Sequence, residues 1–324
     1  QILEEGINEA GSFSSWIAAA TSYSNSGIQT IPFYIFYSMF GFQRIGDLAW
    51  AAGDSRSRGF LLGATAGRTT LNGEGLQHED GHSHLLSATI PNCVSYDPCF
   101  SYELAVIMQN GLERMIKNQE DVFYYITLMN ENYQHPEMPK NINEDIIKGI
   151  YKFSESKTKG PKVQLMGSGV ILREVIEAAN ILEKDFKVSS TVFSVTSFTE
   201  VRRDSLDVER WNMRNPEKVE KQSVLDKIIV DLESPIITAT DYMKSFAEQI
   251  ATFLPNKFIS LGTDGFGRSD SREALRDFFE VDRYHIVIAA LKALTERKEI
   301  DKSVLLQAIK KYKIVNDKPN PVSL

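Results

Sequence analysis

The residues best suited to acid–base chemistry lie in one polar, glycine-rich loop. Residues 71–84 read LNGEGLQHEDGHSH and hold three of the chain's five histidines, at positions 78, 82 and 84. Imidazole exchanges protons near neutral pH and also ligates transition metals. The loop, which also carries Glu74, Glu79 and Asp80, therefore predicts either an active-site lining or a metal site. Its spacings match no standard metal motif.

Glu9 is a second candidate, in the first turn of a helix expected over residues 5–22. The helix dipole alone favours an acid at that position. A catalytic interpretation instead requires a buried carboxyl group whose pKa is raised, so that it can relay protons near neutral pH. The residue type and its position leave both interpretations open.

An aromatic belt forms the third candidate, with six aromatic residues among residues 33–42 against 10% in the whole chain. Tyr37, Phe40 and Arg44 follow one another at spacings of three and four, which allows them to share a helical face. The belt predicts either an aromatic core or a platform on which a flat heterocycle stacks.

Alternating strands and helices must position these three groups. The expected strands cover residues 30–36, 59–64, 90–95, 122–128, 162–166, 191–195, 235–239 and 258–261. The expected helices cover residues 5–22, 39–52, 102–115, 171–184 and 241–253, followed by a helix from Ser271 with a capping box of Asp270 and Glu273, and two helices capped by Asp282 and Asp301. Residues 65–87 remain as a long loop, which in a compact domain is usually functional, and residues 130–142 are expected to link two α/β domains.

Composition narrows the class of protein. The chain has 324 residues and a formal net charge of -7, which argues against a nucleic-acid-binding surface. Its two cysteines predict neither a disulfide framework nor a zinc site. No apolar run is long enough to cross a membrane, so a cytoplasmic protein is expected. The first residue is Gln1, which suggests part of a longer or processed polypeptide.

Three longer motifs resemble the bacterial single-chain, homodimeric type of thiamine-diphosphate-dependent pyruvate dehydrogenase. They are residues 67–84, residues 31–35 with 39–44, and residues 261–270 (LGTDGFGRSD). The resemblance spans the chain and places it in the C-terminal third of that family's polypeptide. It implies an α/β fold in which residues 1–139 form the later part of the thiamine-diphosphate-binding (pyrimidine) domain. Residues 140–324 would form a transketolase C-terminal-like domain.

The resemblance also implies roles at the cofactor for five residues. Glu9 corresponds to the glutamate bonded to ring nitrogen N1′ of the aminopyrimidine, where proton exchange activates the cofactor. Ile7 corresponds to the apolar residue that props the cofactor in its bent shape. Phe40 matches the ring stacked on the aminopyrimidine, Tyr37 lies beside it, and Arg44 lies at the cofactor's edge.

Substrate binding is implied for the histidine-rich loop. His78 is similar to the histidine that orients pyruvate and its adducts, and Glu74 belongs to the same loop network, whereas His82 and His84 are taken as structural. The chain has no Gly-Asp-Gly motif with the downstream Asn that anchors the diphosphate through Mg²⁺ in this family. The resemblance therefore implies no metal ligand here and a site completed by the missing N-terminal diphosphate-binding domain, so that the segment alone is inactive.

The leading hypothesis is oxidative decarboxylation of pyruvate with acetyl transfer to a lipoyl group. By resemblance, the partners are a second copy in a homodimer and the lipoyl domain and core of a dihydrolipoyl acetyltransferase, with no nucleic acid and no membrane. Two alternatives stay open: a metal-dependent hydrolase built on loop 78–84, and a non-catalytic, dimerising α/β module whose aromatic belt is core.

Overall fold

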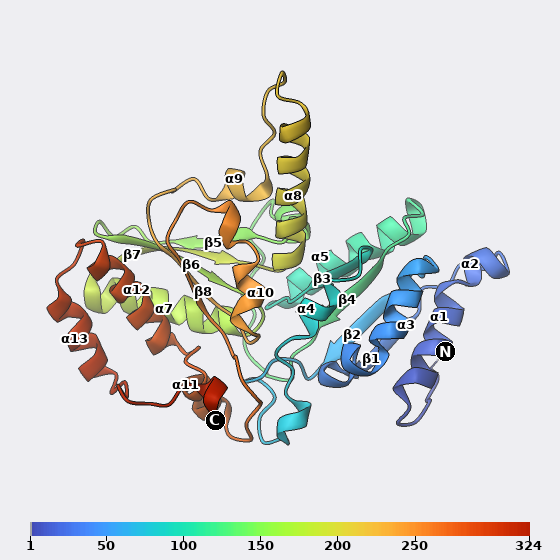
Figure 1. Ribbon diagram of the computed structural model, residues 1–324, viewed down its shortest axis with the longest axis horizontal. Coiled ribbons are helices and arrows are strands. Elements are labelled where there is room, and N and C mark those ends of the chain that lie inside the picture. The colour runs from blue at the N-terminus through green and yellow to red at the C-terminus, as the bar shows by residue number, and fades with distance from the viewer. Residues whose placement is uncertain (1) are drawn as a thin grey trace.

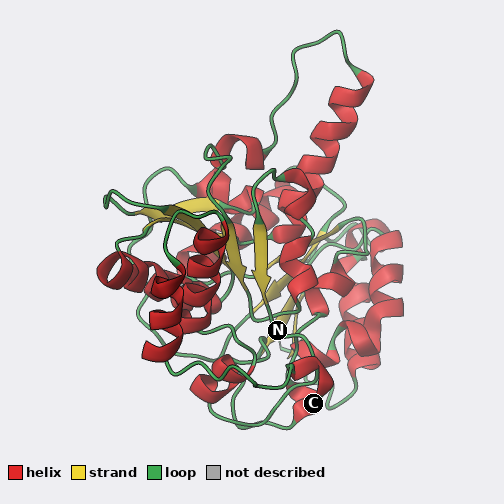
Figure 2. Ribbon diagram, turned by 60° about the vertical axis from the view of Figure 1, so that its left-hand side comes forward, coloured by secondary structure: helices red, strands yellow, loops and turns green. Residues whose placement is uncertain are grey.

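Two sheets organise residues 2–324 in the computed structural model, and helices pack on both faces of each (Figures 1 and 2). Gln1, where the first predicted domain begins, lies outside the described residues. The first sheet has four strands in the order β1-β2-β4-β3, and the second has five in the order β5-β7-β6-β8-β9. The predicted α/β class is confirmed.

The first sheet is parallel throughout. Its strands are β1 (Phe33–Tyr37), β2 (Phe60–Ala64), β3 (Cys93–Tyr96) and β4 (Phe123–Thr127). One face packs on α1 (Glu9–Ala20) and α3 (Phe42–Asp54), and the other packs on α5 (Ser101–Leu112) with the short π-helix η3 (Glu113–Lys117). The shorter elements are α2 (Ser22–Asn25), η1 (Ser38–Phe40), η2 (Leu76–His78) and α4 (Ser83–Ser87). Because β2, β3 and β4 are covered on both faces, their sequences are apolar and aromatic runs with little alternation.

The second sheet is parallel except at one edge, where β5 (Tyr151–Glu155) runs antiparallel to β7 (Ser189–Ser194). The remaining strands are β6 (Lys162–Gly167), β8 (Ile236–Ala239) and β9 (Phe258–Leu261). One face packs on α7 (Ile171–Phe186), α11 (Arg272–Phe278), α12 (Arg283–Glu296) and α13 (Lys302–Lys311), and the other on α8 (Phe198–Arg214), α9 (Val224–Ile228) and α10 (Lys244–Glu248). The short elements α6 (Asn143–Lys148), η4 (Ala251–Phe253) and η5 (Pro321–Ser323) complete the chain. In Figure 1 the far end of α8 extends away from both sheets.

The helix predicted over residues 241–253 starts three residues later than expected and is broken into two short pieces. Only α10 and η4 are helical there, because Asp241 is fully buried and accepts hydrogen bonds from Thr69 and Thr70 instead of starting a helix. The predicted capping box is wrong, since the N-cap of α11 is Ser271, whose hydroxyl accepts from the backbone N–H of Ala274.

The caps at Asp282 and Asp301 are confirmed. The sequence did not predict α6, β5 or α8, and the loop over residues 65–87 contains η2 and α4. No helix within residues 2–324 combines the length and apolarity needed to cross a membrane.

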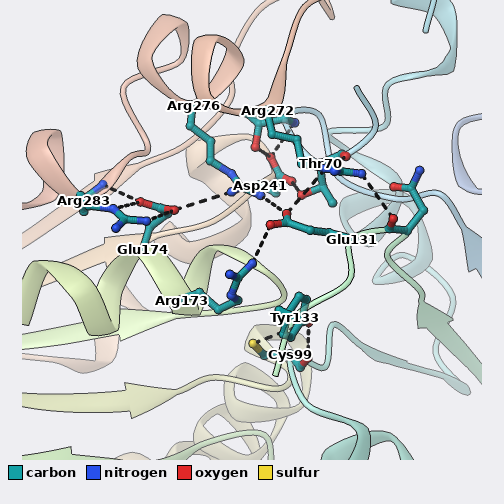
Figure 3. A network of polar contacts seen from close by, with 12 residues as sticks. Thr70, Cys99, Glu131, Tyr133, Arg173, Glu174, Asp241, Arg272, Arg276 and Arg283 are labelled. Carbon is teal, nitrogen blue, oxygen red and sulfur yellow. Dashed lines mark hydrogen bonds and ion pairs between the residues drawn. The ribbon is translucent and has the colours of Figure 1, made fainter. Parts of the chain in front are cut away.

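The segment between the sheets is held by a network of ion pairs around Glu131 (Figure 3). Its carboxylate accepts from Arg173 of α7 at 2.6 Å and from Arg276 of α11 at 2.5 Å. Arg276 also lies 3.6 Å from Glu174, which pairs with Arg283 at 2.8 Å. Burial raises the pKa of Glu131, but the hydrogen bonds and charges of the two arginines outweigh burial and lower the pKa below its usual value. Ion pairs therefore hold the segment between the sheets against α7 and α11. These helices belong to the second unit, which is the second sheet with the helices that pack on it.

Replacing Glu131 by Ala should reduce the free energy of unfolding by about 3 kcal/mol, because the nearly buried Arg276 loses its main counter-charge. Since the folded-state pKa of Glu131 lies below the unfolded value of about 4.3, its ionic contribution is complete above that pH. The contribution is lost as the pH falls through the folded-state pKa of Glu131. Urea unfolding at neutral and acidic pH measures both effects. Glu113→Ala, which breaks an exposed pair with Lys117, is the control and should change stability by less than about 0.5 kcal/mol.

Candidate active site

Three rings meet where β1 ends. Tyr37 is the last residue of β1, Phe40 ends η1, and His78 ends η2. Ring centroids lie 6.1 Å apart for Tyr37 and Phe40, 5.8 Å for Tyr37 and His78, and 5.1 Å for Phe40 and His78. The carboxyl ends of parallel strands are where α/β folds commonly bind ligands. The structure thus joins the aromatic belt and the histidine-rich loop in one cluster.

Glu9 joins the same cluster through Arg44. Its Oε1 accepts a hydrogen bond from Nη1 of Arg44 at 2.6 Å, and the Arg44 guanidinium carbon lies 4.2 Å from the Phe40 ring centroid. Glu9 is the first residue of α1, and the side chain of the N-cap Asn8 accepts from Gly11. The helix therefore begins four residues later than predicted, which sets Glu9 at its positive end. The Glu9 side chain is 20% exposed, against 48% for Arg44.

His78 lies beside Glu74. Its Nδ1 is 3.8 Å from Oε2 of Glu74, which is an ion-pair distance rather than a hydrogen bond. That nitrogen is buried and has no hydrogen-bond partner among residues 2–324. A buried polar atom without a partner is uncommon and indicates either a bound group or a functional demand.

Ile7 lies outside this cluster. Its side chain is 99% exposed, and Gly6 before it has a φ of +67°. The structure therefore brings together Glu9, Tyr37, Phe40, Arg44, Glu74 and His78, and leaves Ile7 free of packing contacts on the segment that leads into α1.

The other two histidines of the loop face different surroundings. Nε2 of His82 lies 2.6 Å from the side-chain nitrogen of Gln43. His84 is buried, with Nε2 at 3.0 Å from the Thr127 hydroxyl, and burial lowers its pKa to about 4 despite the nearby charge of Asp80. Among residues 2–324, the loop histidines are not gathered with metal-ligand spacing; a set with such spacing is Asp277, Asp282 and His285. Nothing in the geometry supports a metal-dependent hydrolase built on loop 78–84.

The sequence offered Asp80 only as a possible metal ligand or active-site group, and sequence reasoning missed its structural role. Asp80 is completely buried and accepts hydrogen bonds from the hydroxyls of Ser38 and Ser83 and from the backbone N–H groups of His82 and Ser83, the last two at 3.0 Å. Burial alone would raise its pKa, but these donors outweigh burial and lower it. Ser83 also accepts from Tyr125 at 2.8 Å. The position of Asp80, two residues after His78, was the available signal.

Two family models match the chain in succession. The pyruvate dehydrogenase E1 component middle domain matches residues 1–136, and the transketolase-like C-terminal domain matches residues 149–282. The chain is 60% identical over 326 residues to the pyruvate dehydrogenase E1 component of Cupriavidus necator, 61% over 324 residues to that of Pseudomonas aeruginosa, and 60% over 323 residues to that of Escherichia coli K12. These alignments cover 99–100% of the chain.

The chain belongs to the pyruvate dehydrogenase E1 component family. It spans 36–37% of the length of these relatives. Among solved structures, transketolase from Leishmania mexicana superposes with a TM-score of 0.67 at 15% identity, over 90% of this chain and 37% of that one. Transketolase from Campylobacter jejuni gives 0.65 at 17% identity, over 85% and 38%. At this identity, the likeness shows a transketolase-like fold.

Replacing Asp80 by Asn should lower the free energy of unfolding by about 2 to 3 kcal/mol, because four donors lose a charged acceptor in a buried position. Thermal unfolding followed by circular dichroism measures the change. Asp207→Asn, on the exposed side of α8, is the matched control and should stay within about 0.5 kcal/mol of the parent. Equal stability of the two variants would contradict the structural role of Asp80.

Proposed function

We propose that this chain supplies the aminopyrimidine half of a thiamine-diphosphate site in an E1 component that decarboxylates pyruvate oxidatively and transfers the acetyl group to a lipoyl group. The observation that carries the proposal is the cluster in which Glu9, Arg44, Phe40 and His78 meet, within a chain 60% identical throughout to proteins named for this component. Because the chain covers little more than a third of those relatives, the remaining machinery must lie in the rest of the protein.

The residues present fit the aminopyrimidine. The Glu9 carboxylate accepts a hydrogen bond from Arg44. Because a carboxylate accepts several hydrogen bonds, Glu9 can also bind a ring nitrogen of the aminopyrimidine. Tyr37 is 46% exposed, so part of its ring remains open for a flat heterocycle beside Phe40. When bound, thiamine diphosphate supplies the electron sink that decarboxylation requires.

With the cofactor bound, the residues of this chain would have separate roles. Glu9 holds or releases a proton at the ring nitrogen, and Arg44 fixes the carboxylate in place for that exchange. The His78 ring lies beside Tyr37 and Phe40, where the imidazole can bind an oxygen of the 2-oxo acid, and Glu74 lies 3.8 Å from its Nδ1. Ile7 would act only once the cofactor is present, as an apolar prop beside Glu9. Magnesium would be held outside this chain.

An exposed apolar strip indicates that the site is completed by another surface. β1 is an edge strand, and Phe33, Ile35 and Tyr37 on one of its faces are 46%, 65% and 46% exposed. Apolar strips of this kind usually mark interfaces. We propose that a homodimer covers this strip with a diphosphate-binding domain. The boundary between residues 1–139 and 140–324 is part of the same proposal, as are a cytoplasmic location and docking to a lipoyl domain and a dihydrolipoyl acetyltransferase core.

Glu9→Gln in the full-length protein should reduce pyruvate turnover by about 100-fold or more, because the amide cannot exchange the proton. Steady-state assays with thiamine diphosphate, Mg²⁺ and pyruvate measure the loss. Glu5→Gln, an exposed acid four residues earlier, is the control and should turn over within about twofold of the parent. Near-normal turnover of Glu9→Gln would favour the non-catalytic α/β module.

The chain of residues 1–324 alone should neither bind thiamine diphosphate tightly nor decarboxylate pyruvate. A diphosphate without its metal ion and anchoring backbone loses most of its binding free energy. Isothermal titration calorimetry with thiamine diphosphate and Mg²⁺ tests this expectation. A dissociation constant below about 1 μM would overturn the composite-site proposal.

A further inference from the structure

The motif at residues 261–270 is one of the three that carry the family resemblance. It is not part of the ring cluster, which is formed by Tyr37, Phe40 and His78. It follows β9 in the second unit and lies against the histidine-rich loop of the first. The backbone N–H of Arg268 donates to Oε2 of Glu79 at 2.6 Å. The backbone N–H of Gly73 donates to the carbonyl of Asp270 at 3.0 Å. Two hydrogen bonds therefore join this segment to the two ends of the stretch that carries η2.

Gly267 brings the backbone of this segment onto η2 itself. A Cβ atom at Gly267 would lie 2.7 Å from the carbonyl oxygen of Leu76 and 2.7 Å from Oε2 of Glu79. Real Cβ atoms do not approach so closely, and one of the two neighbours is backbone. Leu76 begins the turn that ends in His78. Only glycine at this position lets the segment touch that turn.

Glu79 is an unusual anchor for such a contact. It is completely buried, and its Oε1 has no hydrogen-bond partner among residues 2–324. Burial raises its pKa to about 8, although the Arg268 N–H and nearby arginine charges act in the opposite direction. A buried, incompletely paired carboxyl group destabilises a fold, so its presence next to His78 indicates a demand other than stability.

We propose that Glu79 and Gly267 are positioning residues, through which residues 262–268 clamp η2 and fix the ring of His78 against Tyr37 and Phe40. Three consecutive residues then make three different contacts. His78 contacts the ring cluster, Glu79 accepts a hydrogen bond from Arg268 in the second unit, and Asp80 accepts hydrogen bonds from buried donors in the first unit. The clamp follows from the contacts alone. Its effect on turnover rests on the function proposed above for His78.

Gly267→Ala in the full-length protein tests the clamp without relying on activity. Hydrogen exchange of peptides covering residues 71–82, followed by mass spectrometry, should become about tenfold faster because the turn is displaced. The control is Gly46→Ala on α3, where a Cβ meets nothing within 4 Å, and its exchange over the same residues should not change. The kcat/KM for pyruvate should fall about tenfold in Gly267→Ala, with the affinity for thiamine diphosphate unchanged.

A pair of variants at Glu79 keeps the test valid if Gly267→Ala does not fold. Glu79→Gln keeps a neutral acceptor for the Arg268 N–H and should retain exchange and turnover within about twofold, whereas Glu79→Ala should reproduce both losses. Normal exchange over residues 71–82 in Glu79→Ala would overturn the clamp. Faster exchange with normal turnover would support the clamp and contradict the substrate role of His78.

Discussion

The buried carboxylate of Asp80 is the interaction on which the geometry of the candidate site depends. It accepts from Ser38, which lies between Tyr37 and Phe40 in the chain, and from the backbone N–H groups of His82 and Ser83 in the loop that carries His78. One acid thus fixes the two sides of the ring cluster to each other. Burying a carboxylate is costly unless it is hydrogen-bonded, and the four donors around Asp80 offset that cost. The same donors hold the group in its charged form.

Other contacts connect the residues around Asp80 to the N-terminal helix and to the second unit. Toward the N-terminus, Arg44 links the Phe40 ring to Glu9, so an acid at the start of α1 enters the cluster through a stacked guanidinium. Toward the C-terminus, Glu79 and the threonines that pair with Asp241 bind the loop to the second unit. The loop is therefore rigidly supported although it contains little regular structure. Binding sites held to fractions of an ångström require this kind of support.

The sequence predicted the parts of the site that are marked by residue type. Histidines in a glycine-rich loop and aromatic residues after a strand are visible in a linear chain, and the structure joins them. Alternating strands and helices likewise predicted the α/β class. The Glu9 to Arg44 pair spans 35 residues, and only the resemblance to a family placed both at one cofactor.

The parts that could not be predicted depend on distant partners. Asp80 reaches Ser38 across 42 positions, and Asp241 is held by Thr69 across 172, which removes Asp241 from the helix that its local sequence predicted. β5 was missed because it lies at a sheet edge, where three of its five residues, Lys152, Ser154 and Glu155, are polar and exposed. α8 was missed because polar residues dominate it and its far end extends from the body of the molecule (Figure 1). For Asp80, Asp241 and β5, tertiary contact rather than local propensity decides the structure.

A structure of the full-length protein with thiamine diphosphate, Mg²⁺ and a pyruvate analogue bound is the most direct test of the composite site. The Glu9 carboxylate is expected within about 3 Å of the aminopyrimidine ring nitrogen, with His78 facing the analogue. A cofactor bound away from Glu9, or an analogue out of reach of His78, would contradict the composite site.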